Sequence, residues 1–332
     1  MTGDMLRRRN AQIAALDDVP LLDGPWFRRT IVDAVRDGAR IASLFARETD
    51  SLIELVAVLA GDASGELGLA RTRLDAASFQ SITPDCPQAQ LFEREIAEQY
   101  GVQPAGHPWL KPVRLHDVAT DFFRVEGEEV HEVAVGPVHA GVIEPGHFRF
   151  QCHGERVFHL EIALGYQHRG VERALIGGPH SRTVFMMETA AGDSTIAHTL
   201  AYSLAVEALA GAKPPARAQV LRGIALELER LANHTGDLGA LSGDVAYLPA
   251  AAYCGRLRGD YLNLTAELCG SRFGRGLVRP GGVVFDLAAD RVDAFIDKLA
   301  TATREAVDAI GLLWTTPSVI ERFENTGTVD PA

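Results

Sequence analysis

The sequence predicts an α+β protein: a small N-terminal α/β domain, then a small antiparallel β-sheet, then a mainly α-helical bundle. Three observations support this order. Short apolar runs bounded by turn residues occupy the first third of the chain, an alternating polar–apolar pattern follows near residue 150, and helical periodicity prevails after Gly170. We therefore expect one domain over residues 1–115, an acidic linker over 116–129 and a second domain over 130–332.

The N-terminal domain is expected to contain two strands at residues 41–45 and 52–59, which are apolar runs of strand length. The second run is followed by Gly-Asp-Ala-Ser-Gly, a sequence typical of a turn. One helix is expected before these strands, at residues 27–37. A second helix is expected over residues 88–100, because proline lies near its start and Gly101 at its end.

The second domain is expected to open with strands. Residues 147–152 and 157–162 each alternate between polar and apolar side chains, and a His-Gly pair separates them. This pattern predicts a β-hairpin. A shorter apolar stretch at 133–135 predicts a further strand before it.

Four apolar stripes with helical spacing predict a bundle of four long helices. The first helix is expected to be capped by a side chain at 193–195. The second starts at Pro214-Pro215, and the polar residues 233–237 are expected to end it. The third ends at Gly270, and the fourth covers residues 292–310.

Composition limits the possible functions. A net charge of −12 argues against a nucleic-acid-binding surface, which is normally basic. The four cysteines form no Cys-x-x-Cys pair, so we expect a reducing compartment and no zinc or iron–sulfur site made from them alone. Because there is no apolar run of membrane-spanning length and no apolar signal core at the start, any membrane association is expected to go through a partner.

Several stretches carry groups capable of chemistry. His139, Glu144 and His147 lie in a Gly- and Pro-rich stretch and could exchange protons near neutral pH, although a surface turn with solvated histidines would have the same composition. Arg169 could bind an anionic group or belong to a surface salt-bridge network. His198 lies one turn into a predicted helix, where it could face a pocket or be a hydrogen-bonded core residue.

The stretch GPVHAGVIEPGHFRFQCHGERVFHLEIALGYQHRGVERAL, residues 136–175, resembles the large subunit of group 4 energy-converting nickel–iron hydrogenases, the hydrogenase-4 and formate hydrogenlyase type. It also resembles the homologous quinone-site subunit of respiratory complex I. Residues 197–209, 229–247 and 275–283 look like the same family, and residues 91–111 are similar to the small hydrophilic subunit of complex I. The resemblance implies a fusion of the two modules with a hydrogenase large-subunit-like fold, truncated at its C-terminus relative to the family.

The resemblance also implies that nickel ligands are missing. In these hydrogenases a Glu-Arg-x-Cys-Gly-x-Cys motif supplies two thiolates to nickel, and a second pair lies near the C-terminus. Here Glu188 takes the place of the glutamate, and Ala191 and Ser194 take the places of the two cysteines. Since neither side chain can supply the soft thiolate that such a site needs, we expect no metal bound by this chain.

The comparison with complex I implies half of a quinone site. His147 matches the loop histidine that hydrogen-bonds a quinone headgroup, but the position of its partner tyrosine, twelve residues before His198, holds Met186. Glu144 lies where the hydrogenases have a proton-transferring glutamate. The resemblance therefore implies Glu144, His147 and His198 as catalytic residues, in a pocket lined by His139, Arg169, Met186, Glu188, Ala191, Asp193 and Ser194.

The function that the resemblance implies is that of a hydrophilic-arm subunit in a membrane-bound, complex-I-like redox complex. It would couple electron transfer from an iron–sulfur small subunit to ion translocation without a nickel–iron site. The expected partners are that subunit, a ferredoxin-like subunit and antiporter-like and other membrane subunits, at the cytoplasmic side of a bacterial or archaeal inner membrane. No cofactor is expected to be held firmly, although a quinone or another small redox molecule could bind.

The alternative is a scaffold subunit without a ligand. A quinone-reducing subunit and a true nickel–iron hydrogenase are weaker alternatives, because the tyrosine and both cysteines of the first pair are absent.

Overall fold

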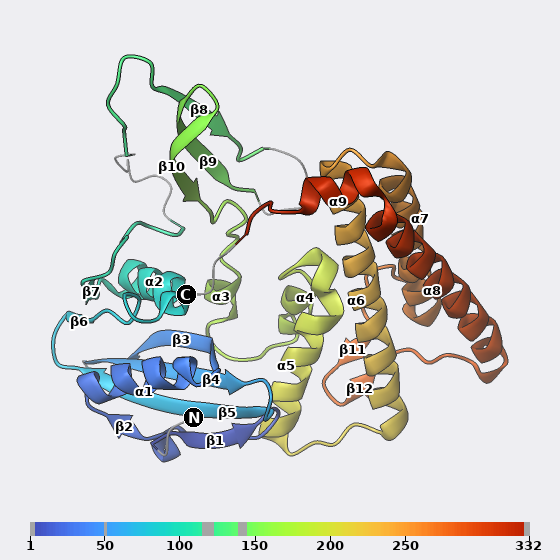
Figure 1. The fold of residues 1–332 in the computed structure, drawn as a ribbon. Helices are drawn as coiled ribbons and strands as arrows, with labels where there is room; N and C mark the ends of the chain where they lie inside the picture. Colours follow the sequence, from blue (N-terminus) through green and yellow to red (C-terminus); the bar gives the residue numbers. More distant parts are fainter. Residues whose placement is uncertain (1–3, 50–51, 115–122, 139–144, 329–332) are drawn as a thin grey trace. The chain divides into compact units, whose positions relative to one another are not determined.

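A computed structural model of the chain describes residues 4–49, 52–114, 123–138 and 145–328 (Figure 1). The chain divides into two compact units, Met1–Arg169 and Gly170–Ala332, each with its own apolar core. Helices and small, mainly antiparallel sheets make up the structure, so the predicted α+β class is confirmed. The linker expected at 116–129 lies inside the first unit and partly outside the described residues, so it stays a prediction.

The first unit contains a five-stranded sheet with strand order β1-β5-β4-β3, in which β2 pairs in parallel with β5. The two predicted apolar runs form β3 and β4, and the predicted turn joins β4 to β5. The strands of this sheet are β1 (Leu6–Arg9), β2 (Leu21–Leu22), β3 (Arg40–Thr49), β4 (Leu52–Gly61) and β5 (Glu66–Leu74).

Helices α1 (Gly24–Arg36) and α2 (Gln90–Tyr100) confirm the two helices predicted for this unit. The carboxylate of Asp23 caps α1 by accepting a hydrogen bond from the backbone N–H of Trp26 at 2.7 Å. Gly101 ends α2 in the left-handed conformation, with φ of 66°. The sheet and both helices share one buried cluster, which includes Phe27, Ile31, Leu55, Leu59 and Ile96.

A second, three-stranded antiparallel sheet has the order β10-β9-β8. It consists of β8 (His131–Val135), β9 (His147–His153) and β10 (Arg156–Ala163). The predicted hairpin is therefore confirmed as β9 and β10, and the predicted short strand as β8. The first unit also contains the parallel pair β6 (Ser78–Gln80) and β7 (Gln103–Ala105) and the 3-10 helices η1 (Leu16–Asp18) and η2 (Pro87–Ala89).

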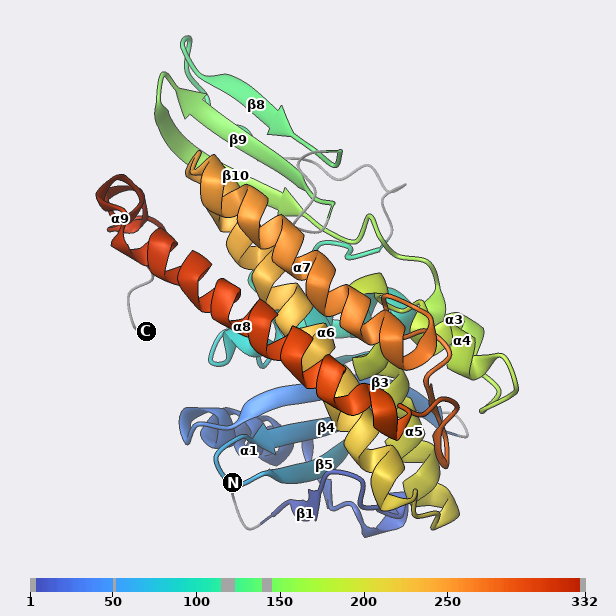
Figure 2. The ribbon, with the colours of Figure 1, turned by 90° about the vertical axis from the view of Figure 1, so that its right-hand side faces the viewer.

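The second unit is the predicted helical bundle, in which α6 packs along α7 and α8 packs against α7 (Figure 2). Apolar side chains of these helices and of α5 form one buried core. The helices are α3 (Val171–Leu175), α4 (Thr183–Glu188), α5 (Thr195–Ala210), α6 (Ala216–Asp244), α7 (Leu248–Cys269), α8 (Val292–Thr315) and α9 (Pro317–Phe323). Shorter elements are η3 (Gly192–Ser194), η4 (Ala289–Arg291) and the strand pair β11 (Val278–Arg279) and β12 (Gly282–Val283).

The prediction that residues 233–237 end a helix is wrong, because α6 continues through them to Asp244. Gly236 and Gly239 do not end the helix; their lack of a side chain makes room for α7. A Cβ atom added at Gly239 would lie 3.1 Å from the Cβ of Cys254, and one added at Gly236 would lie 3.0 Å from the Cδ of Arg258. Both contacts are to α7, so the missing side chains allow α6 and α7 to approach each other closely.

Across the described parts of both units, the helices are all too short or too polar to cross a membrane.

The packing of α5 leads to a first testable prediction. Gly274 has φ of +71°, and a Cβ atom there would overlap the side chain of Ile196, whereas Gly270, with φ of +78°, has open space at that position. Gly274→Ala is expected to lower the free energy of unfolding by about 2–3 kcal/mol, and Gly270→Ala by about 1 kcal/mol. Urea unfolding followed by circular dichroism at 222 nm measures both, and equal losses would contradict the packing described here.

Candidate functional site

The turn between α4 and α5 contains Glu188, Ala191 and Ser194, the positions at which the sequence resemblance implies missing nickel ligands. Glu188 ends α4, Ala191 directly precedes η3, and Ser194 is the last residue of η3. The backbone N–H of Ser194 donates to the carbonyl oxygen of Ala191 at 3.1 Å. The hydroxyl of the buried Thr195 bonds to the carbonyl oxygens of Glu188, at 3.1 Å, and Gly192, at 3.0 Å. The turn is thus closed by its own backbone and one threonine.

The cap of α5 comes from another helix, so the prediction of a cap at 193–195 is wrong. Ser194 occupies the cap position, but its side chain makes no capping hydrogen bond. Instead, the carboxylate of Glu229 in α6 accepts from the backbone N–H groups of Ile196, at 2.6 Å, and Ala197, at 3.0 Å. A carboxylate suits this place because a helix N-terminus offers unpaired N–H groups and a partial positive charge.

Burial raises the pKa of the Glu229 carboxyl, because desolvation disfavours the charged form. The hydrogen bonds from Ile196 and Ala197 act in the opposite direction, and the negative charge of Asp193 adds to the increase. Asp193 is itself bound by side chains of α6 and α7. Its carboxylate lies 3.3 Å from Nη2 of Arg258, and its carbonyl oxygen accepts from the amide of Asn233 at 3.0 Å.

Glu188 fastens the turn to the glycine-rich loop that carries β11 and β12. Its buried carboxylate accepts from Nη1 of Arg279 at 2.6 Å and from the backbone N–H of Gly276 at 2.9 Å. The carboxylate of Glu207 in α5 also binds this loop, because it accepts from the backbone N–H of Gly281 at 2.7 Å. The loop is therefore bound at two points, by Glu188 at the end of α4 and by Glu207 near the end of α5.

Glu207 also forms a buried ion pair with Arg222 of α6. The two side chains are 5% and 3% exposed, and the guanidinium donates to both carboxylate oxygens, at 2.6 and 3.1 Å. Arg222 further donates to the carbonyl oxygens of Arg279, at 2.5 Å, and Gly282, at 2.9 and 3.1 Å. Burial alone would raise the pKa of Glu207, but the hydrogen bonds from Arg222 and Gly281 and the charge of Arg222 lower it overall.

The structure places the predicted site residues in two groups. Glu188, Ala191, Asp193 and Ser194 meet at the turn, with half-buried Met186 in the preceding helix and exposed His198 in the first turns of α5.

The other described candidates belong to the first unit. His147 starts β9, is half-buried, and its Nδ1 lies 3.2 Å from the carbonyl oxygen of Gly136. Arg169 is exposed at the end of that unit. His139 and Glu144 lie outside the described residues.

The sequence does not predict the five charged residues that support the turn. Glu229 and Arg279 fall within the family-like stretches 229–247 and 275–283, but neither was singled out there. These side chains bind partners that are tens of residues away in the chain, and local sequence patterns do not predict such contacts. The residues are Glu207, Arg222, Glu229, Arg258 and Arg279.

The residues of this chain do not fit the nickel–iron group that its resemblance implies. Ala191 and Ser194 carry no thiol, and the cysteines Cys254 and Cys269 are buried in α7, where burial raises the pKa of each thiol. Thiolates are the ligands that such a site requires. Within the residues that the structure describes, no group of three or more His, Cys, Asp or Glu side chains is placed to hold a metal ion.

Glu229 gives a second testable prediction. Because its pKa is raised in the folded state, the folded protein keeps this proton above pH 4.5, where the unfolded chain loses it, and stability falls as pH rises through the folded-state pKa. Glu229→Gln is expected to remove this loss, so its free energy of unfolding should improve relative to the wild type as the pH rises above 4.5. The exposed Glu227→Gln in the same helix is the control, and urea unfolding across this pH range is the measurement. Parallel curves for Glu229→Gln and wild type would contradict the assignment.

Comparisons with known proteins identify two family segments in the chain. Residues 36–123 match the family described as respiratory-chain NADH dehydrogenase, 30 Kd subunit, and residues 244–332 match the 49 Kd subunit.

Among curated relatives, formate hydrogenlyase subunit 5 of Escherichia coli is 29% identical over 79% of this chain and 51% of its own length. Hydrogenase-4 component G of the same organism is 30% identical over 77% and 51%, and NADH-quinone oxidoreductase subunit 4 of Thermus thermophilus is 32% identical over 61% and 50%. The chain thus spans about half the length of the curated relatives it matches.

A solved structure, the membrane-bound sulfane sulfur reductase, an archaeal respiratory membrane complex, contains a chain with the same fold. It aligns with a TM-score of 0.57 at 24% identity, over 61% of this chain and 54% of that chain. The chain is therefore a homologue of these hydrogenase and NADH-quinone oxidoreductase subunits, in which segments of the 30 kDa and 49 kDa subunit families of respiratory-chain NADH dehydrogenase are joined in one polypeptide.

Proposed function

We propose that the chain is a hydrophilic-arm subunit of a membrane-bound, complex-I-like redox complex that works without a nickel–iron site. In this role it couples electron transfer from an iron–sulfur partner subunit to ion translocation by membrane subunits. The observation that carries the proposal is the union of both family segments in a chain whose thiolate positions hold Ala191 and Ser194.

The turn between α4 and α5 is held by hydrogen bonds and ion pairs, although the two positions proposed to correspond to thiolate ligands hold Ala191 and Ser194. Glu188 still binds Arg279, and Glu229 still caps α5, so the turn keeps a defined shape through protein contacts alone. A chain built this way can position a partner and exchange protons, but it cannot supply the soft ligands of a nickel centre. The proposed redox partner molecule is a quinone or another small redox compound that is not held firmly by this chain.

Glu144, His147 and His198 are the proposed acid–base groups. A carboxyl and two imidazoles can take up or release protons near neutral pH, which links electron transfer to proton movement. The other candidate site residues that the resemblance implies stay proposals: they are His139 and Arg169 in the first unit and Met186, Glu188, Ala191, Asp193 and Ser194 in the second unit.

The proposed partners follow from the relatives, which include subunits of hydrogenases and of NADH-quinone oxidoreductases. They are an iron–sulfur small subunit, a ferredoxin-like subunit and antiporter-like and other membrane subunits. The proposed location is the cytoplasmic side of a bacterial or archaeal inner membrane, with attachment through these partners.

A scaffold subunit without a ligand is the second candidate. The polar groups of the turn favour it, because Glu188, Asp193 and Glu229 all bind other parts of the second unit. In that case the chain would hold the iron–sulfur subunit and transmit changes of shape.

The proposal is tested by purifying the tagged full-length chain from its own cells and analysing the complex for metals and subunits. We expect iron–sulfur and membrane subunits to be recovered with it, and nickel to be far below one atom per chain even when nickel-maturation factors are supplied. One nickel per chain would overturn the reading of Ala191 and Ser194, and recovery of the chain without any such partner would overturn the proposed role.

Variants then separate the redox pocket from the scaffold. If Glu144 and His147 transfer protons, Glu144→Gln and His147→Gln should assemble normally but lower electron transfer by a factor of about 10²–10⁴. His153→Gln, at the exposed end of the same strand as His147, is the matched control and should keep full activity. Full activity in all three variants would favour the scaffold.

A further inference from the structure

The five-stranded sheet of the first unit has two faces, and its helices bury one of them. Leu55 and Leu59 of β4 share a core cluster with side chains of α1 and α2, and Figure 1 shows α1 lying across the sheet. Because side chains alternate along a strand, Glu54 and Val56 project to the opposite side, which we call the second face. The residues of β3, β4 and β5 on this face include Phe45, Arg47, Leu52, Glu54, Val56, Arg71 and Arg73.

The second face has the composition of a covered surface. From Leu52 to Ala60, β4 is apolar at every position except Glu54, a pattern typical of strands that are buried on both sides. Two large apolar side chains of this face, Phe45 and Leu52, are nevertheless 43% and 44% exposed. The face therefore offers apolar area for a partner to bury.

Three arginines of the second face surround one carboxylate. Arg47 and Arg73 are the cross-strand neighbours of Glu54, which is 1% exposed. Arg71 donates from Nη1 to Oε1 of Glu54 at 3.1 Å and lies 4.0 Å from the exposed carboxylate of Asp17. The buried carboxylate of Glu54 is therefore already engaged by Arg71.

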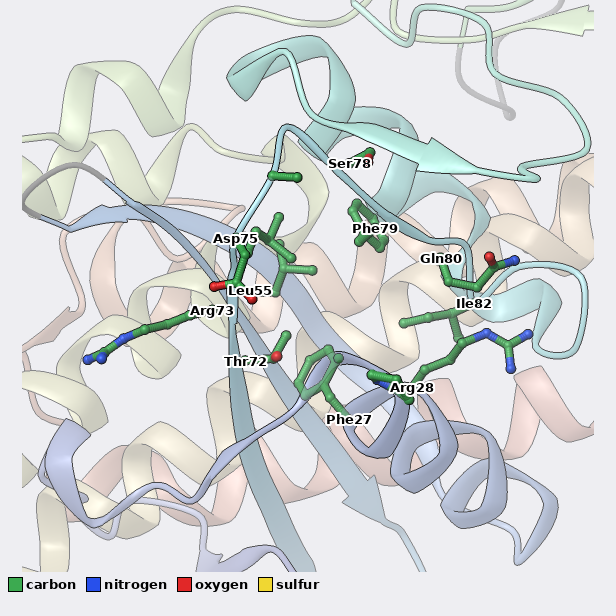
Figure 3. Close-up of a pocket in the computed structure, with 14 residues that line it drawn as sticks. Phe27, Arg28, Leu55, Thr72, Arg73, Asp75, Ser78, Phe79, Gln80 and Ile82 are labelled. Carbon is green, nitrogen blue, oxygen red and sulfur yellow. The ribbon is translucent and has the colours of Figure 1, made fainter.

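Arg47 and Arg73 share what remains of this carboxylate. Their Nε atoms lie 3.8 and 3.5 Å from the oxygens of Glu54, longer than the roughly 2.7–3.2 Å of an N–H···O hydrogen bond, and their side chains are 39% and 50% exposed. Figure 3 shows a cavity on the helix-covered side of the sheet, and Arg73 extends away from the other labelled side chains there. Two guanidinium groups on the second face thus carry more positive charge than Glu54 balances.

This charge determines which kind of partner fits the apolar area. Burying a guanidinium under an apolar surface without a counter-charge is unfavourable, whereas a carboxylate can bind it through two parallel hydrogen bonds. Arg47 is two residues from Phe45 on the same strand and face. A partner that covers Phe45 also covers Arg47, so it must bring negative charge.

We propose that the second face docks an acidic segment of another subunit of the complex. A carboxylate of that segment is bound by Arg47 and Arg73, and its apolar side chains pack on Phe45 and Leu52. The inference rests on the proposed function, because it takes the partner to be a subunit of the same complex.

Carbodiimide cross-linking of the complex purified from its own cells tests this docking. The reagent joins amines to carboxylates and leaves guanidinium groups unmodified, so Arg47→Lys and Arg73→Lys keep the charge and add an amine. We expect each variant to give a cross-link, identified by mass spectrometry, from the new amine to an Asp or Glu of a partner subunit. Arg29→Lys, at an exposed position of α1, is the matched control and should give no such link.

Recovery of the partners is the second measurement. The double variant Arg47→Gln with Arg73→Gln is expected to retain at least about tenfold less of one partner subunit, because the lost guanidinium groups leave a carboxylate of the partner buried and unpaired. The double variant Arg29→Gln with Arg36→Gln, which removes two exposed arginines of α1, should retain it fully. Thermal unfolding followed by circular dichroism checks that both double variants are folded.

The wild-type complex separates this docking from the proposed function. If its partners are recovered but the new amines link only to carboxylates of this chain, or if both double variants retain every partner equally, the docking face is wrong and the proposed function stands. If the wild-type chain is recovered without partners, both are wrong.

Discussion

The buried ion pair between Glu207 and Arg222 is the interaction on which the second unit depends. Two buried charges are tolerated only when their remaining hydrogen-bonding positions are also filled. Here the loop around β11 and β12 fills them, because Gly281 donates to Glu207 while Arg279 and Gly282 accept from Arg222. One interaction therefore joins α5, α6 and the glycine-rich loop, and either side chain alone would be an uncompensated buried charge.

The turn between α4 and α5 is attached to this arrangement through the same loop. Arg279 gives its carbonyl oxygen to Arg222 and its guanidinium to Glu188, so the end of α4 and the start of α6 are linked through one residue. Glu229 then fixes the start of α5 from α6. Carboxylates and arginines therefore hold the turn that contains Ala191 and Ser194 in a defined shape without a bound metal.

Most of the fold could be predicted from the sequence, because its elements depend on local patterns. The strands at 41–45 and 52–59 and the helix ending at Gly101 follow from apolar periodicity and turn residues. The end of α6 could not be predicted, because Gly236 looks like a terminator in sequence but packs against α7. The cap of α5 was missed for a similar reason: Glu229 lies more than thirty residues from the N–H groups it binds. Of the candidate site, Glu188, Ala191, Asp193 and Ser194 could be named from the sequence and stay a prediction as a site, whereas the five charged residues that support the turn could be recognised only from the tertiary structure.

Whether buried ion pairs hold this unit is tested most directly by a double-mutant cycle on Glu207→Gln and Arg222→Met, measured by urea unfolding. Each single change is expected to lower the free energy of unfolding by about 3–5 kcal/mol, and the double variant by no more than either, which corresponds to a coupling of at least about 3 kcal/mol. The exposed pair Arg217–Asp286 is the control, with an expected coupling of about 0.2–1 kcal/mol. Additive losses at Glu207 and Arg222, with no more coupling than the control pair, would contradict a structure held together by this interaction.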